Sequence, residues 1–495
     1  MGSRIYTQIT FTTITSVVIV SGILLLNGVI SRRYGIGALG EYLLMRRIAF
    51  ALVPVSLYGV GITIPRFLGM QRDRPQLRPH ILRWGLTIFA ALGLPTIMLL
   101  VIGLYWAPIG IDSQTVISRA ALPIGLLGAG VSVHQLAYSY FRGLRLMARA
   151  NALHLANIGL LPIVIILSFP KIPILSIVAI HGLAVLLITL VTLAKPLTRA
   201  IRIKPHTGDH SLRREFNSYA LRRLGASWGM LALLVLGPLI MAYLGTWQEV
   251  AIFSVGMQVN RLFFVILGPI GIVMLPTLSY YASKEASTPV RQGIRALYLG
   301  GIALGMYVTC HLWFFAEPLL MTWLGEASQD GVRLFRLFSL SLTGYLLFEL
   351  SRNPIDAFAK TGYNSRNIIA GLACIVAVAA ILVGVFHYPV WQGVTLGYVV
   401  GFWVLGLLSV GTCVRLYGIT WFEPRFFIQT AGLNALIITL LWTVMQYWLV
   451  APPLKLIAAL ELLSILGYIA GLFWLKQEWL TILRSKGSMA TGAER

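Results

Sequence analysis

Long apolar runs separated by short polar turns follow one another along the whole chain. Each run approaches the roughly 20 residues that an α-helix needs to cross a bilayer. Six spans are predicted before the polar stretch that begins at Lys195, near residues 8–30, 42–67, 83–106, 116–140, 151–169 and 174–195. Eight more are predicted after it, near residues 219–244, 250–276, 293–316, 332–353, 367–387, 392–414, 427–450 and 455–475. The pattern predicts an all-α integral membrane protein of about fourteen transmembrane helices.

The second half of the chain repeats the topology of the first. Gly40-Glu41-Tyr42-Leu43 lies opposite Ala251-Ile252-Phe253-Ser254, about 211 residues later, and Ile64-Pro65 lies opposite Leu275-Pro276. We therefore expect two pseudo-symmetric six-helix lobes plus two C-terminal helices. The expected parts are an N-terminal lobe at 1–205, a cytoplasmic basic linker at 206–218, a C-terminal lobe at 219–420, the last two helices at 421–476 and a cytoplasmic tail at 477–495.

The composition excludes a soluble protein and a nucleic-acid-binding module. Of the 495 residues, 58% are hydrophobic and 11% are charged, so little polar surface is left to cover the apolar runs. The net charge of +23 is not gathered on a soluble module. It falls in alternate loops, from Arg72, Arg74 and Arg78 to Arg484 and Lys486, and the positive-inside rule places both termini in the cytoplasm. The first apolar run lacks a small-residue cleavage site, which indicates a retained helix.

No catalytic centre, cofactor or metal site is predicted. The glycines of Gly35-Ile36-Gly37-Ala38-Leu39-Gly40 match a dinucleotide-binding pattern by letter, but no strand precedes them, so they indicate a turn. His206 and His210 have a metal-like spacing, yet Gly208 and the basic neighbours indicate a solvated linker without a helix. The three cysteines, Cys310, Cys374 and Cys413, lie in apolar runs and are interpreted as small core residues.

Ionisable and polar residues inside the predicted spans are the candidate functional residues, because a charge in hydrocarbon costs about 2.5–3.5 kcal/mol and usually faces a cavity. Arg46 and Arg47 lie in the second span, and Arg261 lies near the middle of the eighth, beside Gln258 and Asn260. These spans are partners in the repeat. Guanidinium groups pair with phosphate through two parallel hydrogen bonds, so we interpret the five residues as a cavity lining that binds an anionic headgroup such as a diphosphate.

Two alternatives apply to individual arginines. Arg46 or Arg47 could instead extend to the outer interface, whereas Arg261 is too deep for that. Arg32 and Arg33 depart from the charge rule on the outer side, and they indicate either a basic outer vestibule or contacts with lipid headgroups.

Further polar candidates within the spans are His134, Asn157, Glu461 and the pair Glu349 and Arg352, which lie one turn apart and predict an ion pair. Carboxylates are nearly absent from the first lobe, where Glu41 is the only candidate. This scarcity disfavours a cation-coupled drug exporter, which is expected to use an embedded carboxylate to bind its ion.

The local sequence resembles the polysaccharide-transporter branch of the multidrug/oligosaccharidyl-lipid/polysaccharide exporter superfamily. The similarity is carried by Ile30-Ser31-Arg32-Arg33-Tyr34-Gly35 continuing through Leu39-Gly40-Glu41-Tyr42 after the first helix. Leu275-Pro276-Thr277-Leu278-Ser279 and Ala359-Lys360-Thr361-Gly362 before Arg366 are further echoes. The related lipid II flippases also use arginines on the second and eighth helices for the diphosphate, positions that Arg46 or Arg47 and Arg261 match here.

The resemblance implies a flippase of the bacterial inner membrane that moves undecaprenyl-diphosphate-linked oligosaccharide, of the O-antigen or exopolysaccharide type, by alternating access. Its expected partners are that lipid-linked substrate, membrane lipids and, as a candidate, the glycan polymerase machinery. A lipid II flippase and a cation-coupled multidrug exporter of the same superfamily are the alternatives. A membrane O-antigen polymerase or ligase is disfavoured, because the longest outer loop, Glu317 to Asp330, is short and acidic.

Overall fold

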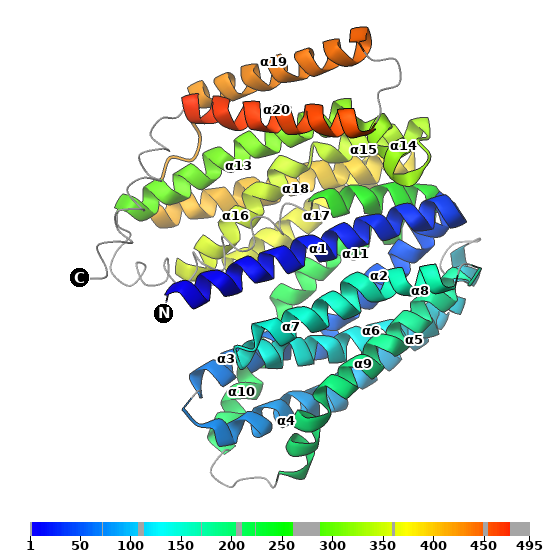
Figure 1. The fold of residues 1–495 in the computed structure, drawn as a ribbon, viewed down its shortest axis with the longest axis vertical. Coiled ribbons are helices and arrows are strands. Elements are labelled where there is room, and N and C mark those ends of the chain that lie inside the picture. The colour runs from blue at the N-terminus through cyan, green and yellow to red at the C-terminus, as the bar shows by residue number, and fades with distance from the viewer. Residues whose placement is uncertain are drawn as a thin grey trace. The chain divides into compact units, whose positions relative to one another are not determined.

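The computed structural model describes residues 2–71, 73–106, 113–169, 171–203, 210–222, 224–260, 288–358, 362–448 and 454–475. All regular structure within these segments is helical, and they contain no strand (Figure 1). The predicted all-α class is confirmed. Arg261 and the second copy of the repeat's closing Leu275-Pro276 lie outside the described residues.

The first half of the chain forms the helices of the predicted N-terminal lobe, the linker and the start of the next lobe. They are α1 (Gly2–Tyr34), α2 (Ile36–Leu57), α3 (Val60–Met70), η1 (Pro75–Leu77), α4 (Arg78–Ile88), η2 (Phe89–Gly93), α5 (Leu94–Trp106), α6 (Ser113–Gly143), α7 (Met147–His154), η3 (Leu155–Leu160), α8 (Leu161–Ser168), α9 (Ile174–Arg202), α10 (His210–Arg222), α11 (Leu224–Leu244) and the helical residues 247–260.

The second half continues with eight described helices. They are α13 (Thr288–Phe314), α14 (Ala316–Leu324), α15 (Gln329–Ser339), α16 (Leu342–Phe358), α17 (Tyr363–Gly384), α18 (Val390–Tyr417), α19 (Pro424–Trp448) and α20 (Leu454–Leu475).

Many of these helices are long and apolar enough to cross a membrane. The described residues contain 10 such spans, or up to 11 if the bent pair α2 and α3 counts as one, and two shorter apolar helices, Trp228–Leu244 and Ala459–Leu475. The predicted span at 250–276 leaves the described residues after Asn260. A protein of about fourteen spans is compatible with these helices, and the chain is a multi-pass membrane protein.

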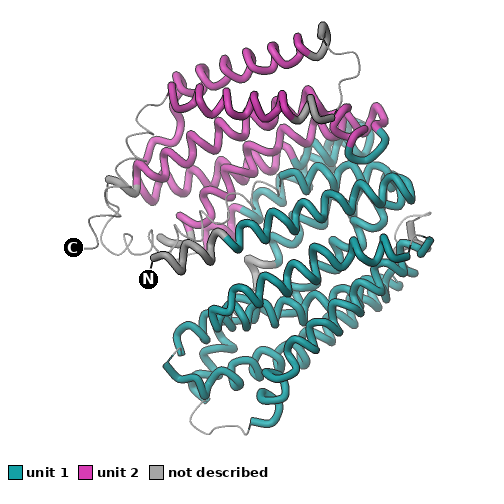
Figure 2. The backbone as a smooth tube through the Cα atoms, in the orientation of Figure 1, with its two compact units in different colours: residues 1–269, 323–326, 368–398 teal, residues 270–322, 327–367, 399–495 magenta. Residues whose placement is uncertain are grey.

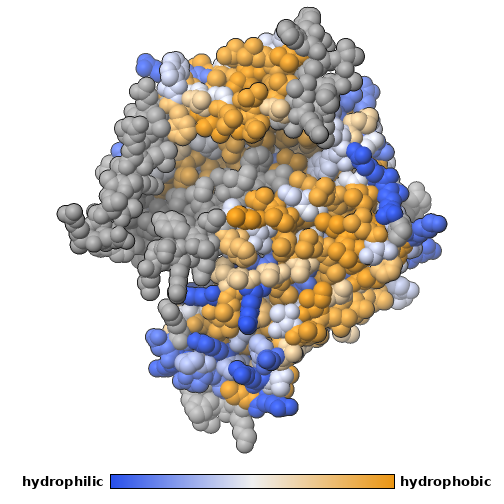
Figure 3. Space-filling view, in the orientation of Figure 1, coloured by the Kyte–Doolittle hydropathy of each residue, from blue (hydrophilic) through white to orange (hydrophobic). Residues whose placement is uncertain are grey.

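The outer surface is suited to lipid. Large apolar side chains are exposed on the membrane helices of the first half of the chain, with Leu99 69% and Val191 76% exposed. Figure 3 shows a broad apolar surface over this part of the chain, with hydrophilic side chains gathered at its ends. Contiguous apolar surface of this extent is rare on monomeric proteins in water, so it is explained by contact with hydrocarbon.

The chain forms two compact units, coloured separately in Figure 2. Unit 1 comprises Met1–Pro269, Trp323–Glu326 and Ile368–Tyr398, and unit 2 comprises Ile270–Thr322, Ala327–Asn367 and Val399–Arg495. In unit 1, α6 packs along α9 and α2, and α2 also packs along α11. Thus α11 joins unit 1 although it opens the predicted C-terminal lobe, whose boundaries stay a prediction.

The second span is bent, whereas the sequence predicted one helix over 42–67. The axes of α2 and α3 differ by 48°. Tyr58 and Gly59 both have left-handed backbone, with φ of 47° and 78°, which ends α2. A Cβ on Gly59 would collide with the carbonyl of Ala220 on α10, so a glycine permits both the turn and the close approach.

Prolines 95 and 162 explain two wide helical turns. The π-helical segment η2 ends two residues before Pro95, and the π-helical segment η3 ends two residues before Pro162. Proline has no N–H to donate to an earlier carbonyl, so the preceding turn widens instead of continuing as an α-helix. The chain passes each of these prolines through one π-helical turn.

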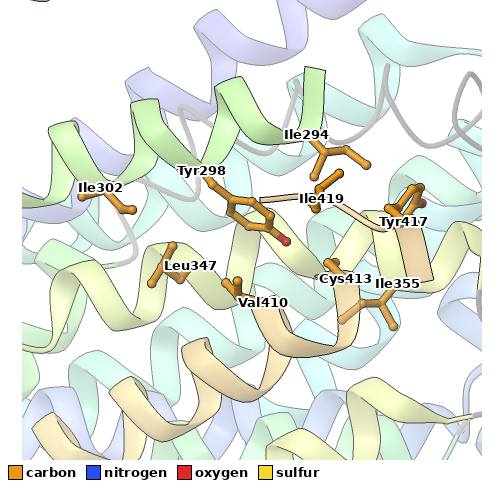
Figure 4. Packing of buried hydrophobic residues seen from close by; sticks show 9 residues of the cluster. All are labelled: Ile294, Tyr298, Ile302, Leu347, Ile355, Val410, Cys413, Tyr417 and Ile419. Atoms are coloured by element: carbon orange, nitrogen blue, oxygen red, sulfur yellow. The ribbon is translucent and has the colours of Figure 1, made fainter. Parts of the chain in front are cut away.

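Unit 2 has its own core between α13, α16 and α18, shown in Figure 4. Tyr298 is fully buried there and its hydroxyl lies 2.9 Å from the Ser351 hydroxyl. The hydroxyl of Tyr417 donates to the carbonyl of Pro354 at 2.9 Å. Cys413 is buried in the same cluster, which confirms its interpretation as a small core residue.

The basic linker contains a docked helix. α10 begins at His210, although no helix was expected there, and residues 204–209 lie outside the described part. Phe216 is fully buried against the rings of Phe67 and Trp84, with centroids 5.2 and 5.7 Å apart. Aromatic packing fixes α10 to the end of unit 1, and this long-range contact is what the local sequence did not reveal.

Candidate functional site

The candidate site lies in unit 1, where α2 meets α11 and the helical residues 247–260. α2 starts directly after Gly35, whose φ of 87° turns the chain out of α1, as the glycine pattern predicted. Gly40 then packs so closely on the carbonyl of Trp247 that a Cβ at this position would collide with it. Contact at this range brings α2 side chains within reach of backbone atoms on the neighbouring helices.

Arg47 ties α2 to two other helices. Its Nη2 donates to the carbonyl of Ser254 at 2.7 Å, and its Nη1 donates to the carbonyl of Leu234 on α11 at 3.0 Å. The same Nη1 lies 3.2 Å from Sδ of Met257. One guanidinium thus spans α2, α11 and 247–260, a use of its fork that a lysine ammonium could not reproduce.

The Leu234 carbonyl is available to Arg47 because of a proline. Pro238, four residues later in α11, has no N–H to donate to it. Beside this gap, the hydroxyl of Tyr398 donates to the carbonyl of Leu233 at 2.9 Å and accepts from the N–H of Gly237 at 2.8 Å. The hydroxyl bridges two groups that an undisturbed helix would pair with each other.

Arg46 occupies a different environment from its neighbour. Only 9% of the residue is exposed, and its guanidinium lies 5.1 Å from the ring centre of Phe50, one turn further along α2. Its charge also acts on His181 of α9. Burial of Arg46 and the contacts of Arg47 show that neither side chain extends along an exposed face of α2.

The polar residues expected beside Arg261 take part in the same region. Gln258 accepts a hydrogen bond from Nδ2 of Asn27 on α1 at 2.6 Å, and Asn260 is buried. Asn27 is fully buried and its Oδ1 has no hydrogen-bond partner. We call this cluster the arginine seam, and its members are Asn27, Arg46, Arg47, Ser254 and Gln258.

The arginines of the expected vestibule lie at the end of α1. Both side chains are exposed, and Arg33 donates to the carbonyl of Ile166 on α8 at 3.1 Å. A Cβ on Gly325 would approach Cγ of Arg32 to 3.0 Å. The two arginines are thus separate from the seam, and their binding roles, like those of Arg46, Arg47, Gln258, Asn260 and Arg261, stay predictions.

Two seam features were missed from the sequence. Asn27 sits in an apolar run, and its amide was a detectable signal because buried amides need partners. Pro238 lies within an apolar run, and a proline leaves a carbonyl without its donor four residues earlier, a signal that points to Leu234.

The chemistry of the seam favours an anion. Two adjacent arginines lie within a membrane-spanning helix, whereas Glu41 is the only carboxylate among the described spanning residues of α1 to α9. Glu41 is half-buried near the start of α2. No group of three or more histidine, cysteine, aspartate or glutamate residues in the described part could hold a metal ion.

The other polar candidates lie elsewhere. Nη1 of Arg352 is 4.0 Å from Oε2 of Glu349 in unit 2, which confirms the predicted ion pair. Glu461 lies 3.6 Å from Nε2 of His311, also in unit 2. His134 and Asn157 meet inside unit 1, at hydrogen-bonding distance.

The chain resembles solved membrane transporters in fold. It matches a lipid II flippase, MurJ, in an inward closed conformation, with a TM-score of 0.71 and 11% identity over 97% of this chain and 100% of that one. A multidrug resistance MATE family transporter of the MOP superfamily, inward-facing, gives 0.64 and 15% over 82% and 98%. MATE in the bent conformation gives 0.54 and 13% over 86% and 96%.

These matches establish the fold, which the chain shares with a lipid II flippase and with MATE transporters. The matched structures named above are a flippase and two transporters. No protein-family model matches the sequence, and no curated protein matches it. The polysaccharide-transporter branch stays a prediction.

Proposed function

We propose that this chain is a flippase for undecaprenyl-diphosphate-linked oligosaccharide in the bacterial inner membrane, with both termini in the cytoplasm, working by alternating access. The observation that carries the proposal is the pair Arg46 and Arg47 on a membrane-spanning helix that contacts α11 and 247–260. Adjacent guanidinium groups in a low-dielectric region attract a doubly charged headgroup much more strongly than they would in water.

The fold supports the same class of function. A shared fold does not fix a substrate, so the lipid-linked anion rests on the arginines and on the family likeness. A lipid II flippase is the second candidate, favoured by the TM-score of 0.71 to one such protein. A cation-coupled drug exporter is less well supported, because two arginines at the seam repel a cationic drug.

A reconstituted flipping assay tests the proposal. Purified protein in liposomes receives a fluorescent undecaprenyl-diphosphate oligosaccharide, and an impermeant quencher reports which leaflet holds it. We expect wild-type protein to move the lipid. Arg46→Gln should slow it by roughly tenfold or more, since a hydrogen bond to a charged group contributes about 1.5–3 kcal/mol, and Arg261→Ala should abolish it.

Lys171→Gln is the matched control, because it removes one positive charge from an exposed site between α8 and α9. It should flip lipid at the wild-type rate. Ethidium and lipid II are tested in the same liposomes. Transport of ethidium without movement of either lipid would overturn the proposal, and preference for lipid II would select the second candidate.

A further inference from the structure

A polar network is buried inside unit 1. It joins His134 on α6, His154 on α7, Asn157 in η3, and His181 and Thr189 on α9. His134, Asn157, His181 and Thr189 have no exposed surface. Buried polar groups in membrane helices are costly and commonly mark ion or proton pathways.

Two imidazoles form the centre of the network. Nε2 of His134 lies 3.0 Å from Nδ1 of His154. The rings are within 20° of parallel and their centroids are 5.3 Å apart, the arrangement of two imidazoles joined edge to edge. Nδ2 of Asn157 lies 3.1 Å from Nδ1 of His134 and donates at 3.0 Å to Oγ1 of Thr189.

These contacts determine where the protons lie at rest. An amide NH₂ can only donate, so Nδ1 of His134 is the acceptor and its Nε2 carries the proton. That proton is donated to Nδ1 of His154, whose own proton is then on Nε2. A row of aligned N–H groups runs from Asn157 through His134 to His154.

The π-helical turn at Asn157 anchors the third histidine. Within η3 the N–H of Leu161 bonds to the carbonyl of Ala156, five residues earlier. The same register would pair the carbonyl of Asn157 with residue 162, which is a proline without N–H. Nε2 of His181 donates to that carbonyl at 2.9 Å instead.

Two buried atoms of the network have no hydrogen-bond partner in this state, Oδ1 of Asn157 and Nδ1 of His181. An unpaired buried acceptor costs about 1–3 kcal/mol. Rotation of the Asn157 amide by half a turn would bring its Oδ1 to His134, where it can accept only if Nδ1 of His134 carries a proton. The unpaired oxygen is therefore complementary to a proton on Nδ1 of His134.

We propose that His134 and His154, with Asn157, form a proton-binding site that is loaded and unloaded during the transport cycle. The proposal rests on the proposed function for what the proton is coupled to, but proton binding itself does not depend on the substrate. Histidine is the side chain whose ordinary titration falls in the physiological range.

Proton balance follows from the geometry. Loading adds one proton at Nδ1 of His134, which donates to the rotated Oδ1 of Asn157, and the two rings share one positive charge. Release removes the proton on Nε2 of His154, while the proton between the rings moves from His134 to Nδ1 of His154. The rings are then neutral, each with its proton on Nδ1 in place of Nε2, and one proton has passed from the Asn157 end to the other end.

Charged and titratable groups face the site from three helices. His181 faces it from α9, Arg46 acts on His181 from α2, and Arg142 on α6 acts on His154. Tyr138 on α6 also stacks near both rings. An anion at Arg46 would weaken the repulsion of a bound proton, so headgroup binding and proton binding are linked reciprocally.

Histidine-selective ¹⁵N NMR of the full-length protein in micelles tests proton binding without any substrate. The chain has 8 histidines, and the signal missing in His134→Gln identifies the site. We expect an imidazolium signal on acidification that His134→Gln abolishes and Asn157→Leu shifts to lower pH. His80→Gln, at another buried histidine of unit 1, should retain it. If every acid-dependent imidazolium signal of the wild-type protein is also present in a folded His134→Gln variant, the proposal is overturned.

Coupling is tested in the flipping liposomes with a pH gradient imposed in either direction. For one proton per lipid, one pH unit should change the equilibrium distribution of lipid by roughly tenfold, and His134→Gln should flip lipid with little response. His311 lies beside Glu461 in unit 2 and is the alternative proton site. Loss of the response in His311→Gln with retention in His134→Gln would refute the site proposed here. Absence of lipid movement by the wild-type protein would count against the proposed function alone, since the NMR titration stands by itself.

Discussion

Pro238 and Arg47 are linked through a single carbonyl group. Pro238 cannot donate a hydrogen bond to the Leu234 carbonyl four residues earlier, and Nη1 of Arg47 donates to it at 3.0 Å. The contact of His181 with the Asn157 carbonyl, five residues before Pro162, follows the same rule. In both places a proline leaves an acceptor for a basic side chain from another helix, and that contact depends on how the helices are packed.

Replacing Pro238 with alanine should weaken the hold of Arg47. Pro238→Ala supplies an N–H that competes for the Leu234 carbonyl, while a hydrogen bond to a charged group contributes about 1.5–3 kcal/mol. We expect lipid flipping to fall several-fold and the thermal midpoint to stay the same or rise, because alanine suits a helix interior. Pro123→Ala in α6 is the control, since no Arg47 contact depends on it. Wild-type flipping by a folded Pro238→Ala protein would contradict the role given to this carbonyl.

The close approach of α2 to residue 247 should be sensitive to a single methyl group. Gly40→Ala places a Cβ against the Trp247 carbonyl, a rigid backbone atom, and overpacking of this kind costs about 1–3 kcal/mol. The thermal midpoint and the flipping rate should both fall. Gly37→Ala is closely matched, because its Cβ would lie 3.8 Å from Cβ of Trp247, an ordinary contact. Equal behaviour of the two variants would show that the packing is looser than described.

The hydrogen bond between Asn27 and Gln258 should appear as an energetic coupling. We expect Asn27→Leu and Gln258→Leu each to lower thermal stability, and the double variant to lose less than the two losses together. Side-chain hydrogen bonds in membrane proteins average about 0.6 kcal/mol in such cycles, with a maximum near 1.7. The distance of 2.6 Å favours the upper part of that range. Strict additivity would mean that the contact does not contribute to the folded state in the membrane.

The sequence predicted the helical class and most spans because hydrophobic length is a local property. Its limits show at Gly59, where the second span bends by 48°. Glycines are frequent in membrane helices, and nothing local distinguishes the one that adopts φ of 78° against α10. Such a turn is selected by tertiary packing, which one sequence does not display.

The candidate site was predicted in part for a similar reason. Arg46 and Arg47 were identified by their charge in an apolar run, a signal that burial cost makes strong. The distinct roles of these neighbours depend on which face of α2 meets α11, and that face follows from the close contact at Gly40. His134 and Asn157 were recognised singly, but their pairing with His154 arises from helices that pack across the lobe.

The docking of α10 gives a test of the basic linker. Phe216→Ala removes a fully buried ring that contacts Phe67 and Trp84, and such truncations cost about 3–5 kcal/mol. We expect α10 to detach more often, so that trypsin cleaves after Arg213 and Arg214 roughly a hundredfold faster, because proteolysis tracks the population of the open form. Leu221→Ala is the control on the same helix, since Leu221 is 46% exposed. Arg213 and Arg214 are exposed even when α10 is docked. Slow cleavage of the wild type and rapid cleavage of Phe216→Ala would therefore mean that α10 must open before trypsin cleaves it. Equal cleavage rates in both variants would mean that the aromatic contacts do not hold the linker.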